Sequence, residues 1–211
     1  MKMFRIFFIF LISIIPINTL RRFSYNFLLK YKIDKNSEIG WLTFINSGKF
    51  ECKNTKIKSF NFISTNYFEI NDSEIGFINK FKDINIVKIN FSKIINKNKF
   101  IGEKKISSEN NFLLNKNSFI ESNNYFDVTD SIEIKENCSI FSYIQIWTHG
   151  FSEKRVIKSK NVLINSGCVI NNACLISMGV QVGENSTIEI GSIVTKSVLN
   201  DGFYFHELQK N

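Results

Sequence analysis

The chain has 211 residues, of which 44% are hydrophobic and 22% charged, a composition that excludes a disordered protein and supports one domain with a sizeable core. Ten glycines and one proline exclude collagen-like and proline-rich sequences. The net charge of +8 favours an anionic partner such as a membrane surface or a polyphosphate, but the scattered basic residues form no stripe typical of nucleic-acid binding. Two histidines are too few for a three-histidine metal site, and the four cysteines form no CxxC pair, so we expect no metal and reduced cysteines in a cytoplasmic protein.

Residues 1–32 predict an N-terminal helix with a large apolar side. The apolar run from Phe7 to Ile17 lacks the cleavage site of a signal peptide and is shorter than a bilayer-spanning helix. We expect an amphipathic helix over 4–29, bent near Pro16. It either lies on the inner leaflet of a membrane or caps the core, and a spanning anchor is a third alternative. The basic residues expected near lipid phosphates are Arg21, Arg22, Lys30 and Lys32.

A six-residue period runs through residues 33–198. One series contains only β-branched aliphatics: Ile164, Ile170, Ile176, Val182, Ile188 and Val194. An earlier series has eight apolar members out of ten: Ile33, Ile39, Ile45, Glu51, Ile57, Ile63, Glu69, Ile75, Phe81 and Val87. A period of six fits neither a helix nor a simple strand. It predicts short strands separated by corners, three to a turn of 18 residues, with the turns stacked about 4.8 Å apart.

These patterns predict an all-β fold, a parallel β-helix over 33–198 with a helix at one end and a short tail, 199–211, at the other. Its turns bury their apolar sides only against each other, so both ends need caps. The period lapses near 93–111, where we expect an irregular turn or a loop. It lapses again at 148–155, where we expect a loop that carries catalytic groups on a rigid scaffold.

Two segments resemble a known family. The stretch 178–196, MGVQVGENSTIEIGSIVTK, is similar to the last full turns of hexapeptide-repeat acyltransferases, and 145–149, QIWTH, resembles a loop of sugar O-acetyltransferases in which a histidine follows an aromatic residue and a threonine. The resemblance implies that the parallel β-helix is left-handed, against the usual handedness of parallel crossovers. It also implies acetyl-CoA as acyl donor and a homotrimer in which His149 of one chain faces the cofactor-binding turns of another.

His149 is the predicted catalytic residue. Acyl transfer to a hydroxyl needs a base that takes the hydroxyl proton, and histidine is suited to this role near neutral pH. The sequence does not decide which group orients the imidazole; the candidates are Asp127, Asp130, Glu153 and a backbone carbonyl. The donor to the tetrahedral oxyanion is equally open, among Asn123, Asn124 and a backbone amide.

The remaining site residues follow from the resemblance and from residue type. The resemblance implies that acetyl-CoA meets Ser177, Gly179, Thr195 and Lys196, with the lysine near a phosphate. The predicted substrate-binding residues are Trp147, Asn124 and Asp127, of which the tryptophan would stack on a sugar ring. His206, after the last repeat, is expected to contact the cap.

We therefore expect an acetyl-CoA-dependent O-acetyltransferase that modifies a sugar hydroxyl of a surface polysaccharide, a lipopolysaccharide or a precursor. It would lie in the cytoplasm, with peripheral contact to the inner face of the membrane through the N-terminal helix. The alternatives are an N-acyltransferase on a nucleotide-linked amino sugar and a catalytically inactive β-solenoid. A zinc carbonic anhydrase built on the same coil would need three histidines, and an ice-binding solenoid a repeated threonine array, and the sequence has neither.

Overall fold

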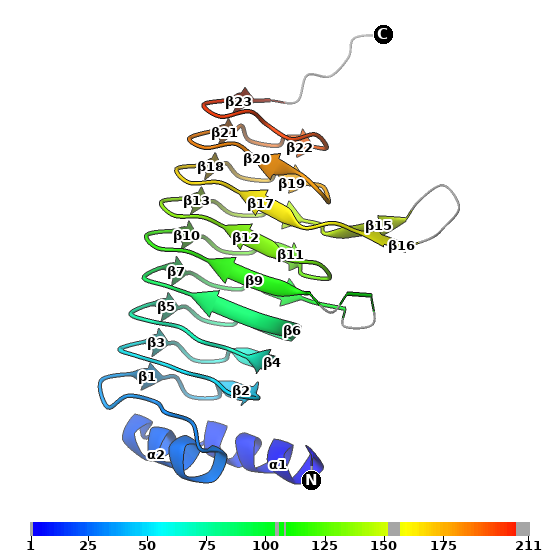
Figure 1. Ribbon diagram of the computed structural model, residues 1–211. Coiled ribbons are helices and arrows are strands. Elements are labelled where there is room, and N and C mark those ends of the chain that lie inside the picture. The colour runs from blue at the N-terminus through cyan, green and yellow to red at the C-terminus, as the bar shows by residue number, and fades with distance from the viewer. Residues whose placement is uncertain (1, 104–105, 108, 152–156, 206–211) are drawn as a thin grey trace.

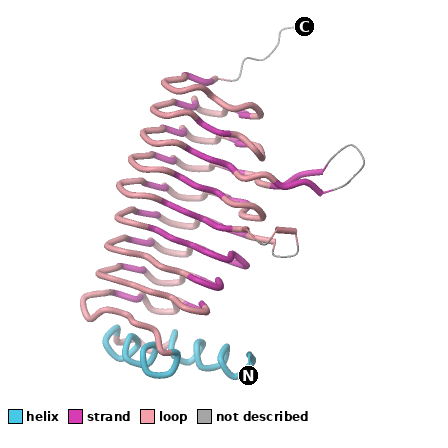
Figure 2. The backbone as a smooth tube through the Cα atoms, in the orientation of Figure 1, coloured by secondary structure: helices cyan, strands magenta, loops and turns pink. Residues whose placement is uncertain are grey.

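A computed structural model describes residues 2–103, 106–107, 109–151 and 157–205, which form a three-sided coil of parallel strands with two helices at its N-terminal end (Figures 1 and 2). The chain rises from the helices towards the C-terminus in stacked turns and winds in the left-handed sense (Figure 1). The predicted left-handed parallel β-helix is therefore confirmed.

The first face of the coil is a parallel sheet, nine-stranded over the described residues. In most of its strands the second residue is an isoleucine, which points inward and pairs with the isoleucine of the neighbouring turn. The strands, in stacking order, are β1 (Glu38–Ile39), β3 (Lys56–Ile57), β5 (Glu74–Ile75), β7 (Lys93–Ile94), β10 (Phe119–Ile120), β13 (Ser139–Ile140), β18 (Val169–Ile170), β21 (Thr187–Ile188) and β23 (Phe203–Tyr204).

The second and third faces belong to one larger sheet that bends around a corner. β6 (Lys80–Ile89) makes the bend, because its first residues pair with the second face and its last residues with the third. With β6, the second face comprises β2 (Phe44–Ser47), β4 (Phe62–Tyr67), β8 (Lys99–Ile101), β11 (Tyr125–Asp127), β14 (Gln145–Ile146), β19 (Leu175–Ile176) and β22 (Ile193–Val194). The third face comprises β9 (Asn111–Leu114), β12 (Ile132–Ile134), β17 (Val162–Ile164) and β20 (Gln181–Val182).

Stacked columns of apolar side chains fill the coil. The second-face column changes from aliphatic to aromatic and back: Ile45, Ile63, Phe81, Phe100, Phe126, Ile146, Ile176 and Val194. Inside it, the ring of Phe100 stacks on those of Phe81 and Phe126, with centroids 4.4 and 4.6 Å away. Since burying one such side chain stabilises a protein by about 1.5–3 kcal/mol, these columns supply the main driving force for folding.

Glu51 and Glu69 do not occupy the inward positions that the six-residue series gave them. Both are partly exposed on the outside, where the Tyr67 hydroxyl donates to them over 3.1 and 3.4 Å. The residues on either side of each glutamate point inward instead: Phe50 and Cys52, and Phe68 and Ile70. Successive residues of extended chain point to opposite sides, so a series that is one residue out of register samples the surface.

The N-terminal segment forms two helices rather than one bent helix. α1 (Lys2–Ser13) and α2 (Asn18–Leu29) flank Pro16, which cannot donate the backbone hydrogen bond that a continuous helix needs. Within the described residues, neither helix has the length and apolar content to cross a membrane.

Both helices cover the N-terminal end of the coil (Figure 1). Ile9, Ile12 and Tyr25 are buried against it, and the Tyr25 hydroxyl donates to the Thr43 carbonyl over 2.9 Å. Arg21 is also buried and donates to the carbonyls of Ile15 and Ile39, while its burial lowers the pKa of the guanidinium. The helix pair is thus tied to the first turns by polar as well as apolar contacts.

The corner between the second and third faces, here called the second corner, carries the irregular parts of the coil. The lapse expected near 93–111 is shorter than predicted, because β7 and β8 are regular and the chain leaves the coil only between β8 and β9. After β14, β15 (His149–Phe151) and β16 (Ile157–Ser159) form an antiparallel hairpin that projects from the corner (Figure 1). The loop predicted over 148–155 thus begins as a strand, and its residues 152–156 lie outside the described part.

The described part of the C-terminal tail adds one more turn. β23 pairs with β21, and Val198 bridges to Val182, so the coil continues beyond the last six-residue repeat. His206 lies outside the described residues.

Candidate active site

His149 stands at the base of the projecting hairpin, on the second corner. Its side chain is 25% exposed, and its Nδ1 lies 2.7 Å from Oδ2 of Asp127, one turn earlier in the coil. A carboxylate only accepts hydrogen bonds, so Nδ1 carries the proton and the lone pair of a neutral imidazole is on Nε2. One nitrogen of His149 is therefore fixed by a carboxylate, while the other has no hydrogen-bond partner among the described residues and could accept a proton.

Asp127 is held by a dense set of donors. Its side chain is only 4% exposed, and its Oδ2 accepts from the backbone N–H groups of Thr148 and His149 over 2.9 and 3.0 Å. Its Oδ1 accepts from the Thr129 hydroxyl over 2.6 Å and from the Thr129 N–H over 3.2 Å. A buried carboxylate needs such donors, and here they also fix the direction from which it meets the imidazole.

Of the groups left open for orienting His149, Asp127 is the one that the structure brings to it. The Asp130 carboxylate accepts from the Ser131 N–H over 2.7 Å instead, and Glu153 lies outside the described residues. Asp127 was also predicted to bind substrate, but its carboxylate is buried and accepts from the donors described above, so we give it no substrate contact in the proposed site.

Asn124 and Asn123 lie at the opposite end of β11 from Asp127. Asn124 is 2% exposed and closes a ladder of buried asparagines in which each Oδ1 accepts the backbone N–H of the next turn. Its own Oδ1 accepts from Ile144 over 2.7 Å, and its Nδ2 donates to the Glu121 carbonyl. Since its amide is used inside the coil, we leave Asn124 out of the proposed site.

Two aromatic residues lie beside the histidine. The Trp147 ring meets the His149 ring edge-on at 6.2 Å and packs against the Tyr125 ring at 5.2 Å. Both side chains are partly exposed, so part of each ring is accessible to a ligand. Burial and the Asp127 charge raise the pKa of Tyr125, which keeps its hydroxyl protonated as a possible donor.

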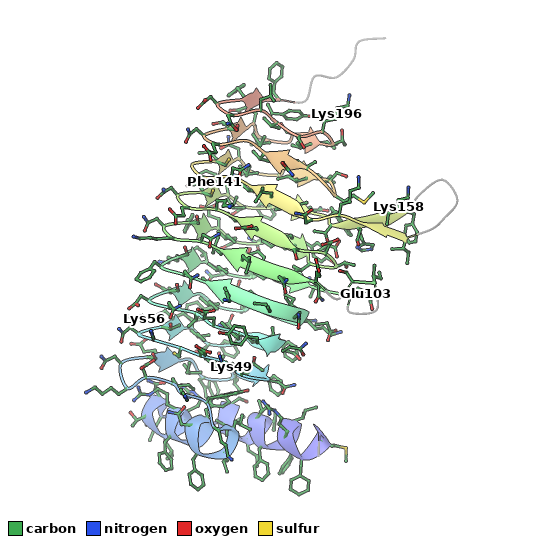
Figure 3. The ribbon with its side chains drawn as sticks, viewed as in Figure 1. Lys49, Lys56, Glu103, Phe141, Lys158 and Lys196 are labelled. Carbon is green, nitrogen blue, oxygen red and sulfur yellow. The ribbon has the colours of Figure 1, made fainter. Side chains whose placement is uncertain are left out.

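The residues predicted to meet acetyl-CoA stack on the turns that follow His149. The backbone N–H of Trp147 donates to the Ile176 carbonyl, and that of Ser177 to the Val194 carbonyl, both over 2.9 Å. Trp147, Ser177 and Thr195 therefore form one vertical row along the second corner. Lys196 lies in the top turn of this row, on the side from which the hairpin with Lys158 projects (Figure 3).

Gly179 lies in the same row and approaches a lysine that the sequence did not single out. Its φ is +77°, and a side chain there would lie 2.9 Å from Cδ of Lys160. Lys160 is exposed, and its backbone N–H donates to the Thr148 carbonyl over 2.9 Å. Lys158, Lys160 and Lys196 thus place three exposed cations at the upper part of the second corner.

Sequence reasoning missed Thr129, Thr148, Tyr125 and Lys160. Thr129 had a local signal, because an aspartate whose side chain accepts from the residue two positions later is a common turn pattern. Thr148 belongs to the QIWTH segment, but the sequence assigned it no role. Its contact with Asp127, like the places of Tyr125 and Lys160, depends on how the turns stack, which a single sequence does not reveal.

In the described part of the chain, no group of three His, Cys, Asp or Glu side chains could hold a metal ion. The site thus combines an imidazole held by a carboxylate with an aromatic surface, and cations lie higher on the same corner.

No protein-family model matches the chain, and no curated protein matches it. Several solved structures are similar to the chain. The hexapeptide-repeat acetyltransferase VCA0836 from Vibrio cholerae, solved with acetyl coenzyme A, is 16% identical over 91% of this chain and 74% of its own, with a TM-score of 0.41. The polySia-specific acetyltransferase NeuO is 18% identical over 82% of this chain and 75% of its own, with a TM-score of 0.43.

A further VCA0836 structure is 22% identical over 44% of this chain, with a TM-score of 0.43, and the match spans 56% of that protein's length. With TM-scores below 0.5, none of these similarities bears on which reaction this chain catalyses.

Proposed function

We propose that the protein is an acetyl-CoA-dependent O-acetyltransferase that modifies a sugar hydroxyl of a surface glycan or its precursor. The observation that carries the proposal is the contact between Asp127 and His149 on a corner where Trp147 lies beside the imidazole. The resemblance of residues 178–196 and 145–149 to hexapeptide-repeat acyltransferases supports the choice of acyl donor and of reaction.

His149 acts as the general base in this proposal. Nε2 takes the proton of the acceptor hydroxyl while the hydroxyl oxygen forms a bond to the thioester carbonyl carbon. The carbon–sulfur bond then breaks, and the imidazolium returns the proton to the departing thiolate. Asp127 keeps the imidazole in the required tautomer and stabilises its charged form, as a positioning residue that does not itself touch the substrate.

The row above His149 suits the acyl donor. Ser177 and Thr195 offer hydroxyl and backbone groups to a pantetheine arm, and Gly179 leaves room where a side chain would meet Lys160. Lys158, Lys160 and Lys196 supply positive charge for its phosphates. Trp147 and Tyr125 provide rings on which a sugar can stack, since aromatic faces combine apolar contact with polar edges.

The assembly and location follow the sequence expectation. We propose a homotrimer in which the second corner of one chain faces that of its neighbour, and a peripheral location on the inner face of the membrane through α1 and α2. The mass of the purified protein in solution tests the first part, with three times 24.5 kDa expected.

Release of free thiol from acetyl-CoA, measured with sugar acceptors, tests the reaction. We expect release with acceptors that carry only hydroxyl groups, and loss of at least a hundredfold in kcat for His149→Ala. Turnover of amino sugars alone would favour the N-acyltransferase alternative. If the folded chain neither binds acetyl-CoA nor turns it over, the catalytically inactive β-solenoid is the remaining alternative.

A further inference from the structure

Side chains of α1 and α2 project away from the coil (Figure 3), and many of the exposed residues of the helices and of the link between them are apolar. We call this surface the outer helix face, and its exposed apolar members are Met3, Phe4, Ile6, Phe7, Phe10, Leu11, Ile14, Ile17, Leu20, Phe23 and Phe27. Scattered exposed apolar residues are normal, but eleven of them on two short helices and the link between them mark a surface that binds a partner.

The charge of this segment indicates what it binds. Residues 1–33 contain six lysines and arginines and no aspartate or glutamate, although the whole chain has 19 acidic residues. Two copies that met through the outer helix face would bring these like charges together, which opposes self-association. An anionic lipid surface neutralises the same charges while it buries the apolar side chains.

A cavity at the edge of this face strengthens the choice of lipid. It has a volume of about 750 Å³ and lies between the helices and the coil. Leu28 lines it, and so does Ile6, which also belongs to the outer helix face. Lys30 brings an exposed cation to its wall, and Arg5 adds a guanidinium that also donates to Asn46, Tyr31 and Ser47. The cavity therefore combines apolar side chains with positive charge. It lies on the coil side of the helices, which is the level of the lipid phosphates when the opposite side of a helix is embedded in a bilayer.

A second hollow of about 390 Å³ shares Lys30 with this cavity. Its lining adds Lys32, Lys49 and Lys53 against Asp34 and Glu51. Lys49 is paired with Glu51. Since the lining has four lysines and two carboxylates, it keeps an excess of positive charge. Basic residues that line the two cavities thus continue from the outer helix face around the C-terminal end of α2.

We propose that the outer helix face docks on an anionic phospholipid bilayer, with lipid phosphates in the cavity beside Arg5 and Lys30. The coil then stands away from the membrane, since both helices lie across its end (Figure 1). This proposal does not depend on the reaction proposed for His149.

Co-sedimentation of the full chain with vesicles tests the docking. We compare phosphatidylcholine vesicles with vesicles that contain equal parts of phosphatidylcholine and phosphatidylglycerol, at low and high salt. We expect at least tenfold tighter binding to the anionic vesicles, and weaker binding at high salt.

Matched variants separate the two contributions. Phe23→Ser with Phe27→Ser removes two rings that are 64% and 71% exposed, and should weaken binding by about tenfold for each ring. Phe91→Ser with Tyr143→Ser removes two rings of similar exposure from the coil and should change nothing. Lys30→Gln with Lys32→Gln should weaken binding to anionic vesicles by about tenfold or more, and leave binding to neutral vesicles unchanged.

Absence of vesicle binding by the folded chain would overturn the docking, and so would an equal loss of binding in the variant with Phe91→Ser and Tyr143→Ser. A fall in solution mass on changing Phe23 and Phe27 would also overturn it, because it would show that a second copy covers the outer helix face. Acetyl transfer to a soluble sugar, measured on the same variants, keeps the two proposals apart. Variants that lose docking should keep this transfer.

Discussion

Replacing Asp127 with asparagine tests how the coil prepares His149. The amide oxygen can take the place of Oδ2, which accepts from the N–H groups of Thr148 and His149 and from the imidazole. The amide nitrogen then faces Thr129, whose backbone N–H loses its acceptor. The variant thus keeps the imidazole tautomer but removes the charge that stabilises the imidazolium.

The expected loss follows from the value of one hydrogen bond to a charged group. Such a bond contributes about 1.5–3 kcal/mol, which corresponds to a fall in kcat of about 10- to 100-fold. The KM for acetyl-CoA should stay the same, because Asp127 lies behind the imidazole. The unpaired Thr129 N–H should cost about 1–3 kcal/mol of stability, which urea unfolding measures separately.

The matched control is Asp130→Asn, which changes a carboxylate of the same segment that binds Ser131 rather than His149. Thiol release from acetyl-CoA gives kcat and KM for both variants. A kcat of Asp127→Asn within twofold of the unchanged protein, or an equal loss in Asp130→Asn, would refute the role given to Asp127.

Three further predictions concern the coil. Phe100→Ala should lower the free energy of unfolding by about 3–5 kcal/mol, because the ring stacks between two buried rings, whereas Phe91→Ala, at an exposed position, should change it by less than about 0.5 kcal/mol in the same urea titration. Gly179→Ala should raise the KM for acetyl-CoA more than Gly191→Ala does. Both glycines have positive φ, but only a side chain at Gly179 would press on Lys160. Equal effects on KM would show that backbone strain alone matters. The four cysteines should resist alkylation until the protein unfolds, because all are buried and burial raises the pKa of Cys52 and Cys174; rapid labelling of the native chain would contradict the packing.

The six-residue period predicted the coil because β-branched and aromatic side chains face inward once per side. Where the chain keeps turns of 18 residues, as from Ile39 to Ile57 and Ile75, the sequence alone locates the stacked partners. The pattern failed at Glu51 and Glu69. There the residues before and after each glutamate point inward, and a shift of one residue along the chain exchanges inward and outward positions.

The site was harder to predict than the coil. His149 stood out because it interrupts the period, but its partner could not be chosen among three carboxylates without knowing how the turns stack. Asparagine gave a misleading signal, because a buried ladder that pairs backbone amides uses the same residue type as an oxyanion donor. Lys160 gave no signal at all, since its place beside Gly179 depends on where the hairpin returns to the coil.

The hairpin that follows β14 leaves the ladder of the coil unbroken. β14 pairs directly with β19, and β12 with β17, so the strands below and above the hairpin meet as if it were absent. Insertions or deletions within it therefore need no change in the stacked core. If the proposed function holds, changes in the length and sequence of this hairpin could alter the choice of acceptor while the stacked core stays the same.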